Sequence, residues 1–361
     1  MRSELSPATT VLPHSRVPYW DNARVACIIL VVLGHSIQRL IHESDAALTT
    51  YLVVYAFHMP AFAIVSGYFA RSGAPTTRQM TRVLTDIVLP YIIMESIWSL
   101  VQFMAEDKTH INPTRPSWTL WFLLALGVFR LVMPYLVLLR WPLAWAVVIS
   151  VGVGYFGNVD NTFALSRALG ILPFFVFGWQ LRRWGLAERW LALRRGSTAV
   201  RGAAITLLLG WIVVVLTFLD TWRSVELRFW FFYDDSYVGL GSQEWWAGGI
   251  RLGVIALAAV LSVAFLVLVP RTPNRMTRYG QFTMYVYLLH SFVLYPLRES
   301  GVMRHTGFPD LWLTGMLLLS IILTVVLSSA PVRRLCRPFV EPKPRWLFAP
   351  EPPDTSRSSP R

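Results

Sequence analysis

Charged residues are scarce in this sequence of 361 residues. They make up 15% of the chain, whereas 55% of the residues are hydrophobic, and ordinary soluble domains contain about a quarter charged residues. A soluble globular domain is therefore excluded, and an integral membrane protein is indicated. The net charge of +13 would indicate nucleic-acid binding in a soluble protein. Here the basic residues fall in short loops between apolar segments, so no nucleic-acid partner is expected.

Cysteine is nearly absent too. Cys27 lies in the first apolar segment and Cys336 in the basic C-terminal part, so no disulfide is expected. No HExxH motif or similarly close pair of ligands occurs, so no metal site is predicted. No small-residue cleavage site follows the first apolar segment, which is interpreted as an uncleaved helix rather than a signal peptide.

Long apolar runs are abundant, and most approach the about 20 residues that a membrane-spanning helix needs. Sixteen Trp and 13 Tyr are typical of aromatic belts at two membrane interfaces. We expect a cytoplasmic segment at 1–19, a transmembrane domain at 20–335 and a disordered basic cytoplasmic tail at 336–361. The sequence predicts an all-α, polytopic fold of about ten transmembrane helices, at residues 24–40, 49–70, 83–104, 118–139, 141–157, 166–182, 201–219, 245–269, 279–298 and 311–332.

The predicted loops differ in charge between the two sides. If the N-terminus is cytoplasmic, most Lys and Arg side chains fall in cytoplasmic loops, as the positive-inside rule requires. Both termini are therefore predicted to be cytoplasmic, in a multi-pass protein of the plasma membrane. The opposite side carries Lys108, Arg115, Arg223, Arg228, Arg298 and Arg304.

Four ionisable residues stand out near the middle of predicted spans: His35, His58, Glu95 and His290. At 1.5 Å per residue, His35 and His290 lie roughly 16 Å and Glu95 roughly 18 Å from the inner edge, and His58 roughly 14 Å from the outer edge. All four therefore approach the midplane of a hydrocarbon core about 30 Å thick. A lone buried histidine is more often a satisfied hydrogen-bonding residue. Four such groups at one depth predict a polar cavity and a catalytic role.

Short motifs at these positions are similar to those of a known family. Arg24 and His35 form an R-x10-H pattern, and the second span carries Phe-His-Met-Pro-Ala-Phe at 57–62. The chain resembles the integral membrane acyltransferase family 3 over residues 19–335. One departure is the spacing of Arg78 and Arg82, since many relatives have R-x-x-R there. Further matching segments lie at 19–22, 65–69, 89–91, 117–123 and 287–290.

The resemblance implies transfer of an acyl group, usually acetyl, from cytosolic acyl-CoA to a hydroxyl of a sugar, glycan or glycolipid, with no bound cofactor. His35 would be either the base that deprotonates this hydroxyl or the nucleophile that carries the acyl group. The sequence does not choose between the two. Glu95 or another carboxylate would orient the imidazole.

Two further groups of residues are candidates for substrate binding. The phosphates of CoA favour arginine, although the positive-inside bias and snorkelling to the interface are alternative explanations. The candidates for acyl-CoA are Arg24, Arg78, Arg82 and Arg130. Interfacial anchoring is the alternative for the candidates on the outer side. The candidates for the acceptor are Trp118, Trp121, Arg167 and Arg251.

Two other classes of protein fit the same pattern. A proton-coupled transporter or flippase of a glycan or lipid-linked substrate would use the histidines as a proton relay. Transporters often contain repeats and broken helices; no repeat stands out, although Pro60 is placed to break the second span. A membrane scaffold or sensor without turnover is the third class.

Overall fold

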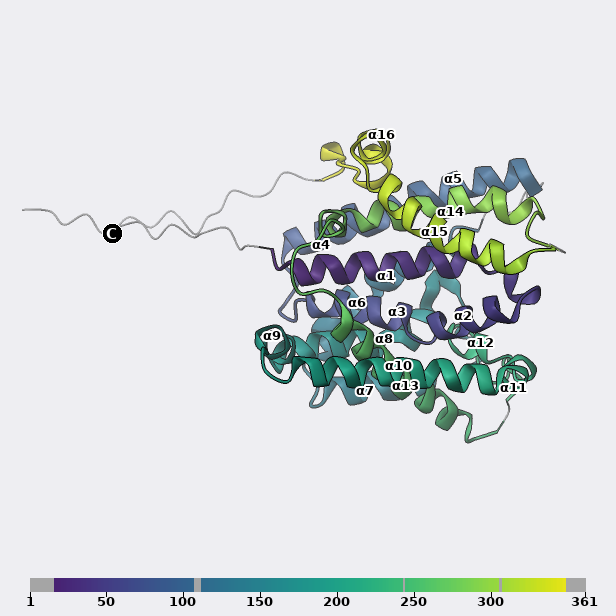
Figure 1. The fold of residues 1–361 in the computed structure, drawn as a ribbon. Helices are drawn as coiled ribbons and strands as arrows, with labels where there is room; N and C mark the ends of the chain where they lie inside the picture. Colours follow the sequence, from purple (N-terminus) through teal and green to yellow (C-terminus); the bar gives the residue numbers. More distant parts are fainter. Residues whose placement is uncertain (1–15, 107–111, 243, 305–306, 349–361) are drawn as a thin grey trace, which may run out of the picture.

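The fold is a bundle of helices. The computed structural model describes residues 16–106, 112–242, 244–304 and 307–348, and within them there is no strand. This confirms the predicted all-α class. The long helices lie roughly side by side (Figure 1). They are α1 (Pro18–Ser36), α2 (Asp45–Tyr55), α3 (His58–Tyr68), α5 (Leu89–Glu106), α6 (Trp121–Leu136), α7 (Pro142–Val153), α8 (Leu165–Arg183), α10 (Ser197–Thr217), α13 (Ala247–Leu268), α14 (Thr283–Glu299) and α15 (Pro309–Leu327).

Short helices occupy the two ends of the bundle (Figure 1). We call the end with α4 and α9 the inner end and the end with α11 and α12 the outer end, after the sides that the loop charges predict. The short elements are η1 (Leu40–His42), α4 (Thr77–Val83), η2 (Leu84–Val88), η3 (Thr162–Ala164), α9 (Leu186–Ala192), α11 (Leu219–Ser224), α12 (Leu227–Trp230), η4 (Thr277–Phe282), α16 (Ala330–Val340) and η5 (Arg345–Leu347).

The apolar helices support a membrane protein. Among the described residues, six helical segments are long and apolar enough to cross a membrane. The predicted number of about ten spans stays a prediction, because α6 and α7 are apolar but shorter. The cytoplasmic position of both termini stays a prediction too. The six segments are Asp45–Tyr68, Thr77–Glu106, Thr162–Arg183, Ser197–Thr217, Ala247–Leu268 and Pro309–Leu327.

Burial separates central from peripheral helices. The apolar window of Asp45–Tyr68 is 83% buried in the protein, whereas that of Ser197–Thr217 is 17% buried and still has a mean hydropathy of 2.2. An apolar helix that its own protein leaves uncovered needs an apolar solvent, which the lipid supplies. The α2–α3 segment therefore forms the centre of the bundle, and α10 faces lipid.

The second predicted span is interrupted near its middle. Helix α2 ends at Tyr55 and α3 begins at His58. Pro60 causes the break, because proline has no N–H and its ring clashes with the carbonyl four residues earlier, that of Ala56. The hydroxyl of Ser262 in α13 donates to the carbonyl of Phe57 across 3.2 Å. The interruption places His58 at the first turn of a helix inside the protein.

Helices α3 and α8 pack at backbone distance. A Cβ atom on Gly67 would overlap the carbonyl of Phe175, and one on Gly178 would overlap the carbonyl of Ile64. Small residues at such positions let helices approach closely where lipid gives no hydrophobic driving force. This close contact places α8, and with it Arg167, against the centre of the bundle.

The C-terminal boundary differs from the predicted one. Helix α16 runs from Ala330 to Val340, so the tail that was expected to begin at residue 336 begins inside a helix. Leu335 is exposed, and Cys336 packs against the core from a half-buried position. A helix with one covered face forms here because that face has a packing partner. Residues 349–361 of the predicted tail lie outside the described residues.

Candidate active site

Three of the four midplane residues come together between α1, α3 and α14. The imidazole centroids of His35 and His290 lie 5.5 Å apart. His58 also lies near enough to interact electrostatically with His35. Its ring packs against Tyr55 at 4.6 Å. Both His58 and His290 are buried. The structure thus brings these three histidines from separate helices together, and their catalytic role stays a prediction.

The ring orientations of His58 and His290 are fixed by the backbone. The Nδ1 atom of His290 lies 2.9 Å from the carbonyl of Val286 and 2.8 Å from that of Tyr287. In His58, Nδ1 lies 2.9 Å from the carbonyl of Val54. A carbonyl oxygen only accepts, so in both rings Nδ1 carries the hydrogen and donates it. In the neutral ring, Nε2 then keeps a free lone pair, so either histidine is able to accept a proton there.

Two buried ring nitrogens lack a partner at the contact between His35 and His290. They are Nδ1 of His35 and Nε2 of His290. Buried polar atoms are nearly always hydrogen-bonded, and exceptions concentrate where a protein binds a ligand or moves protons. The centroid separation of 5.5 Å is short enough for facing ring nitrogens to form a hydrogen bond. The two histidines are thus a unit of adjacent rings with one unpartnered nitrogen each, and no hydrogen bond joins these nitrogens.

Glu95 is not part of this unit. Its carboxylate accepts hydrogen bonds from the backbone N–H of Ser117 at 2.8 Å and from the Ser117 hydroxyl at 2.6 Å. The carboxylate is thus committed to the segment before α6, and its suggested contact with an imidazole is not found among the described residues. Counting residues along a helix gives depth but not the direction in which a side chain points, which explains the difference. Instead, Glu95 anchors the segment that carries Trp118.

Trp118 connects the histidine pair to the outer end. Its ring lies edge-on to His35 at 5.6 Å, and the guanidinium of Arg298 lies 4.8 Å from its centroid. The segment is also held by Tyr287, whose hydroxyl donates to the carbonyl of Thr119 and accepts from the N–H of Leu123. Trp118 has a positive φ of 35°, an uncommon conformation for a bulky residue. Anchors on both sides hold it there.

Arg167 in α8 lies near the histidine pair. Its guanidinium lies 5.1 Å from the centroid of Trp121 and forms an ion pair with Asp234. It interacts electrostatically with His35 and Tyr287. Trp118 and Arg167 thus lie near His35, and Trp121 lies against Arg167; we call these three side chains the wall. Their predicted role in acceptor binding stays a prediction.

Arg251 takes a separate position. It is 1% exposed, its guanidinium faces the rings of Tyr233 and Tyr237 at 5.1 Å and 5.5 Å, and Nη2 donates to the carbonyl of Asp235 at 3.3 Å. These contacts hold the 231–237 segment against α13. The predicted role of Arg251 in acceptor binding stays a prediction, and its contacts are those of a residue that supports the Asp234 segment.

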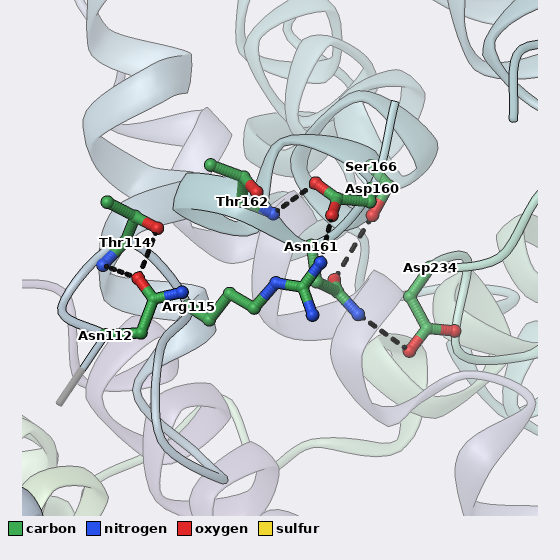
Figure 2. A network of polar contacts seen from close by, with 8 residues as sticks. All are labelled: Asn112, Thr114, Arg115, Asp160, Asn161, Thr162, Ser166 and Asp234. Carbon is green, nitrogen blue, oxygen red and sulfur yellow. Dashed lines mark hydrogen bonds and ion pairs between the residues drawn. The ribbon is translucent and has the colours of Figure 1, made fainter. Parts of the chain in front are cut away.

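A polar network joins the outer loops around these residues (Figure 2). Arg115 donates to Asp160 at 2.5 Å, and Asn161 donates to Asp234 at 3.4 Å. Asn161 also accepts from the hydroxyl of Ser166 at 3.2 Å. The network ties the segment that carries Trp118 to the start of α8 and to the 231–237 segment. It therefore fixes the relative positions of Trp118, Arg167 and Asp234.

The arginines proposed for acyl-CoA fall into two groups. Arg24 pairs with Asp21 at 3.2 Å and lies 4.7 Å from the ring of Phe69, in the S-G-Y-F segment. Arg82 is exposed and interacts electrostatically with Arg130, also exposed, near Asp86. Arg78 is an exposed residue of α4. The contacts of Arg24 and those of the α4–α6 group do not overlap, so a shared phosphate site stays a prediction.

Two cavities open at the outer end. One of about 510 Å³ lies between η1, α2 and α11–α12, and another of about 610 Å³ borders the 224–242 segment. None of the predicted catalytic side chains lines either of them. Within the described part of the chain, no group of three or more His, Cys, Asp or Glu side chains is arranged to hold a metal ion.

Sequence reasoning missed three residues of this region: Ser117, Asp234 and Arg298. Each contacts the site through a partner that lies far away in the sequence, so the residues next to it in the sequence do not indicate its role. For Asp234 one feature stood out, a pair of acids at 234–235 that follows four aromatic residues at 229–232 and Tyr233.

A model of the acyltransferase domain family matches residues 17–332. This chain belongs to that family. Its acyltransferase domain thus covers the described bundle almost from end to end, and the resemblance seen in the motifs is confirmed. No solved structure matches the chain.

Two curated relatives of this acyltransferase domain are nodulation proteins NolL. The protein of Sinorhizobium fredii is 26% identical over 224 residues, which is 57% of each chain. The protein of Mesorhizobium japonicum is 33% identical over 82 residues, which is 22% of each chain. The chain therefore spans little more than half the length of the first relative and less of the second.

Proposed function

We propose that this protein is a membrane O-acyltransferase that moves an acyl group, most simply acetyl, from acyl-CoA to a hydroxyl of a sugar, glycan or glycolipid. Family membership supports acyl transfer. The observation that carries the proposal is the contact between His35 and His290, each with a buried unpartnered nitrogen. It lies between basic residues at the inner end and an aromatic wall at the outer end. The plasma membrane is the compartment that gives access to both substrates.

In this mechanism His35 takes the proton of the acceptor hydroxyl as its oxygen attacks the thioester carbonyl carbon. As the imidazolium forms in this proposal, the Nδ1–H of His35 moves within hydrogen-bonding distance of Nε2 of His290, which then takes the place of a triad's carboxylate. The carbon–sulfur bond then breaks, and the thiolate takes the proton from His35. The products are the ester and free CoA. A covalent acyl-histidine intermediate is the alternative route.

The proposal is tested with the full chain in lipid nanodiscs, with acetyl-CoA and a cell-envelope glycan fraction as acceptor. CoA thiol release and ester formation are both measured. General acid–base groups contribute about 10²–10⁴-fold to rate, so His35→Ala and His290→Ala should lower both signals by at least that factor. His42→Ala is the matched control, since His42 is exposed in η1. Full activity of folded His35→Ala would remove this mechanism.

One observation favours transport as a second function. The second span is broken at residues 56–57 beside His58, and broken helices are frequent at the substrate sites of transporters. Sealed vesicles that contain the protein separate the two functions. Movement of a labelled glycan across the membrane without CoA consumption would support a transporter, whereas ester formation coupled to CoA release supports the enzyme.

A further inference from the structure

The cations around the histidine pair already have carboxylate partners. Arg167 donates through Nε at 3.0 Å and also through Nη2 to one oxygen of Asp234. Arg298 pairs with Glu299 at 3.2 Å, and Arg39 pairs with the same carboxylate at 3.4 Å. The side chains of Arg167 and Asp234 are 21% and 8% exposed, so solvent screens their attraction little. The Arg167–Asp234 pair is thus neutral, whereas Arg39 and Arg298 share the single carboxylate of Glu299 and leave one net positive charge.

Some of the buried polar atoms without a partner belong to residues near His35 and Arg167. They include Oδ1 of Asp234, Nε1 of Trp118, Oγ1 of Thr119 and Oε1 of Gln38. Trp118 contacts His35 directly, and Gln38 lies in the turn that follows α1, three residues after His35. Because buried polar groups nearly always have partners, this set points to a ligand that supplies them. It mixes donors and acceptors, which is the pattern that hydroxyl groups satisfy.

We propose that Asp234 determines acceptor specificity: its free Oδ1 accepts a hydrogen bond from a ring hydroxyl, and its charge neutralises Arg167, so the site selects an uncharged sugar. This rests on the proposed function. A carboxylate or phosphate on the acceptor does not find an unpaired cation in Arg167, because Asp234 already neutralises it, and burying a charge without a partner is costly. A neutral sugar ring meets the indole of Trp121 and the free oxygen of Asp234 without that penalty.

The isosteric change Asp234→Asn separates this idea from a structural role. It removes the negative charge and leaves Arg167 unneutralised, so an acidic acceptor gains an attractive partner. Purified full-length protein in nanodiscs is given acetyl-CoA with methyl glycosides of glucose, galactose and mannose, or with the matching methyl uronides. The ratio of kcat/KM for each neutral glycoside to that for its uronide is measured.

The wild-type protein should favour the neutral glycosides at least tenfold. Asp234→Asn should raise KM for them about tenfold or more and lower the neutral-to-uronide ratio by at least tenfold. Asp234→Glu should keep the ratio, since it keeps the charge. The matched control is Asp220→Asn, because Asp220 also pairs with an arginine, Arg223, but is 97% exposed. It should behave as the wild type.

Three results would overturn the proposal: a wild-type preference for uronides, an unchanged ratio in folded Asp234→Asn, or CoA release without esterification of any neutral glycoside. If the wild type releases no CoA at all, the proposed function itself fails. Protection of the wild type from heat by neutral glycosides, but not by uronides, gives a readout that does not depend on any variant folding.

Discussion

The contact between Glu95 and Ser117 gives the sharpest test of the site's architecture. Glu95 is 4% exposed and accepts two hydrogen bonds from Ser117. Hydrogen bonds to a charged group contribute about 1.5–3 kcal/mol each and neutral ones about 0.5–1.5. In Glu95→Gln the amide is able to keep both contacts but not the charge, because its oxygen accepts from the N–H and its NH₂ donates to the hydroxyl. We expect a loss of about 1–2 kcal/mol in the free energy of unfolding.

A double-mutant cycle with Ser117→Ala isolates this contact. The hydroxyl of Ser117 is worth more beside a carboxylate than beside an amide, so the coupling energy should be about 1 kcal/mol. Reversible unfolding in mixed micelles by increasing SDS measures all four proteins. Glu226→Gln is the control, since Glu226 is 60% exposed and lies 3.7 Å from Arg228; it should change stability by less than about 0.5 kcal/mol.

Kinetics distinguishes positioning from catalysis at the same residue. If Glu95 positions Trp118 through Ser117, Glu95→Gln should raise the acceptor KM and change kcat only a few-fold. Additive effects on stability, together with a fall in kcat of about 10³-fold or more, would refute this reasoning. That result would instead support the role that the sequence suggested for Glu95, the orientation of a catalytic imidazole.

The remaining predictions concern packing and the outer loops. Gly67→Ala places a Cβ on the carbonyl of Phe175, where neither backbone is able to yield, so the loss in free energy of unfolding should exceed the about 1–3 kcal/mol of ordinary overpacking. The control is Gly73→Ala, which has open space at its Cβ. Equal thermal stability of both variants would contradict the close packing. Hydrogen bonds from Thr162 and Arg115 lower the pKa of Asp160 to about 2 from its ordinary 3.8. A depressed folded-state pKa stabilises the protein above the unfolded pKa and loses that effect as pH falls through the folded one. The stability difference between the wild type and Asp160→Asn should therefore be constant above about pH 5 and shrink between pH 3.8 and about pH 2; a difference that does not depend on pH would show that Asp160 acts without its charge.

The polar and aromatic residues of the site follow one another from the inner to the outer end of the bundle. Arg24 and Phe69 lie at the inner end of α1 and α3, the histidines lie midway, and Trp118 leads to the outer end. The two histidines come from α1 and α14, and Trp118 comes from the turn before α6. Anchors from several helices thus hold these side chains in fixed positions.

The sequence by itself determined that the protein needs an apolar solvent, that its fold is all-α and how far each histidine lies along its helix. Apolar runs require lipid whatever their neighbours are, and the rise of a helix fixes how far His35 or His290 lies along it. Pro60 likewise predicted the break in the second span, because its missing N–H acts locally. The R-x10-H and F-H-M-P motifs indicated the family, because each lies within a short stretch of sequence.

Only the tertiary structure decided which groups face one another. Glu95 has the right depth, yet its carboxylate points to Ser117, because the rotation of a helix about its axis depends on what packs against it. Arg167 and Asp234 are 67 residues apart and meet only when α8 and the 231–237 segment are assembled. Ion pairs and proton-sharing pairs act over a few ångströms. Such distances are set by packing between helices, which the pattern of any single helix does not contain.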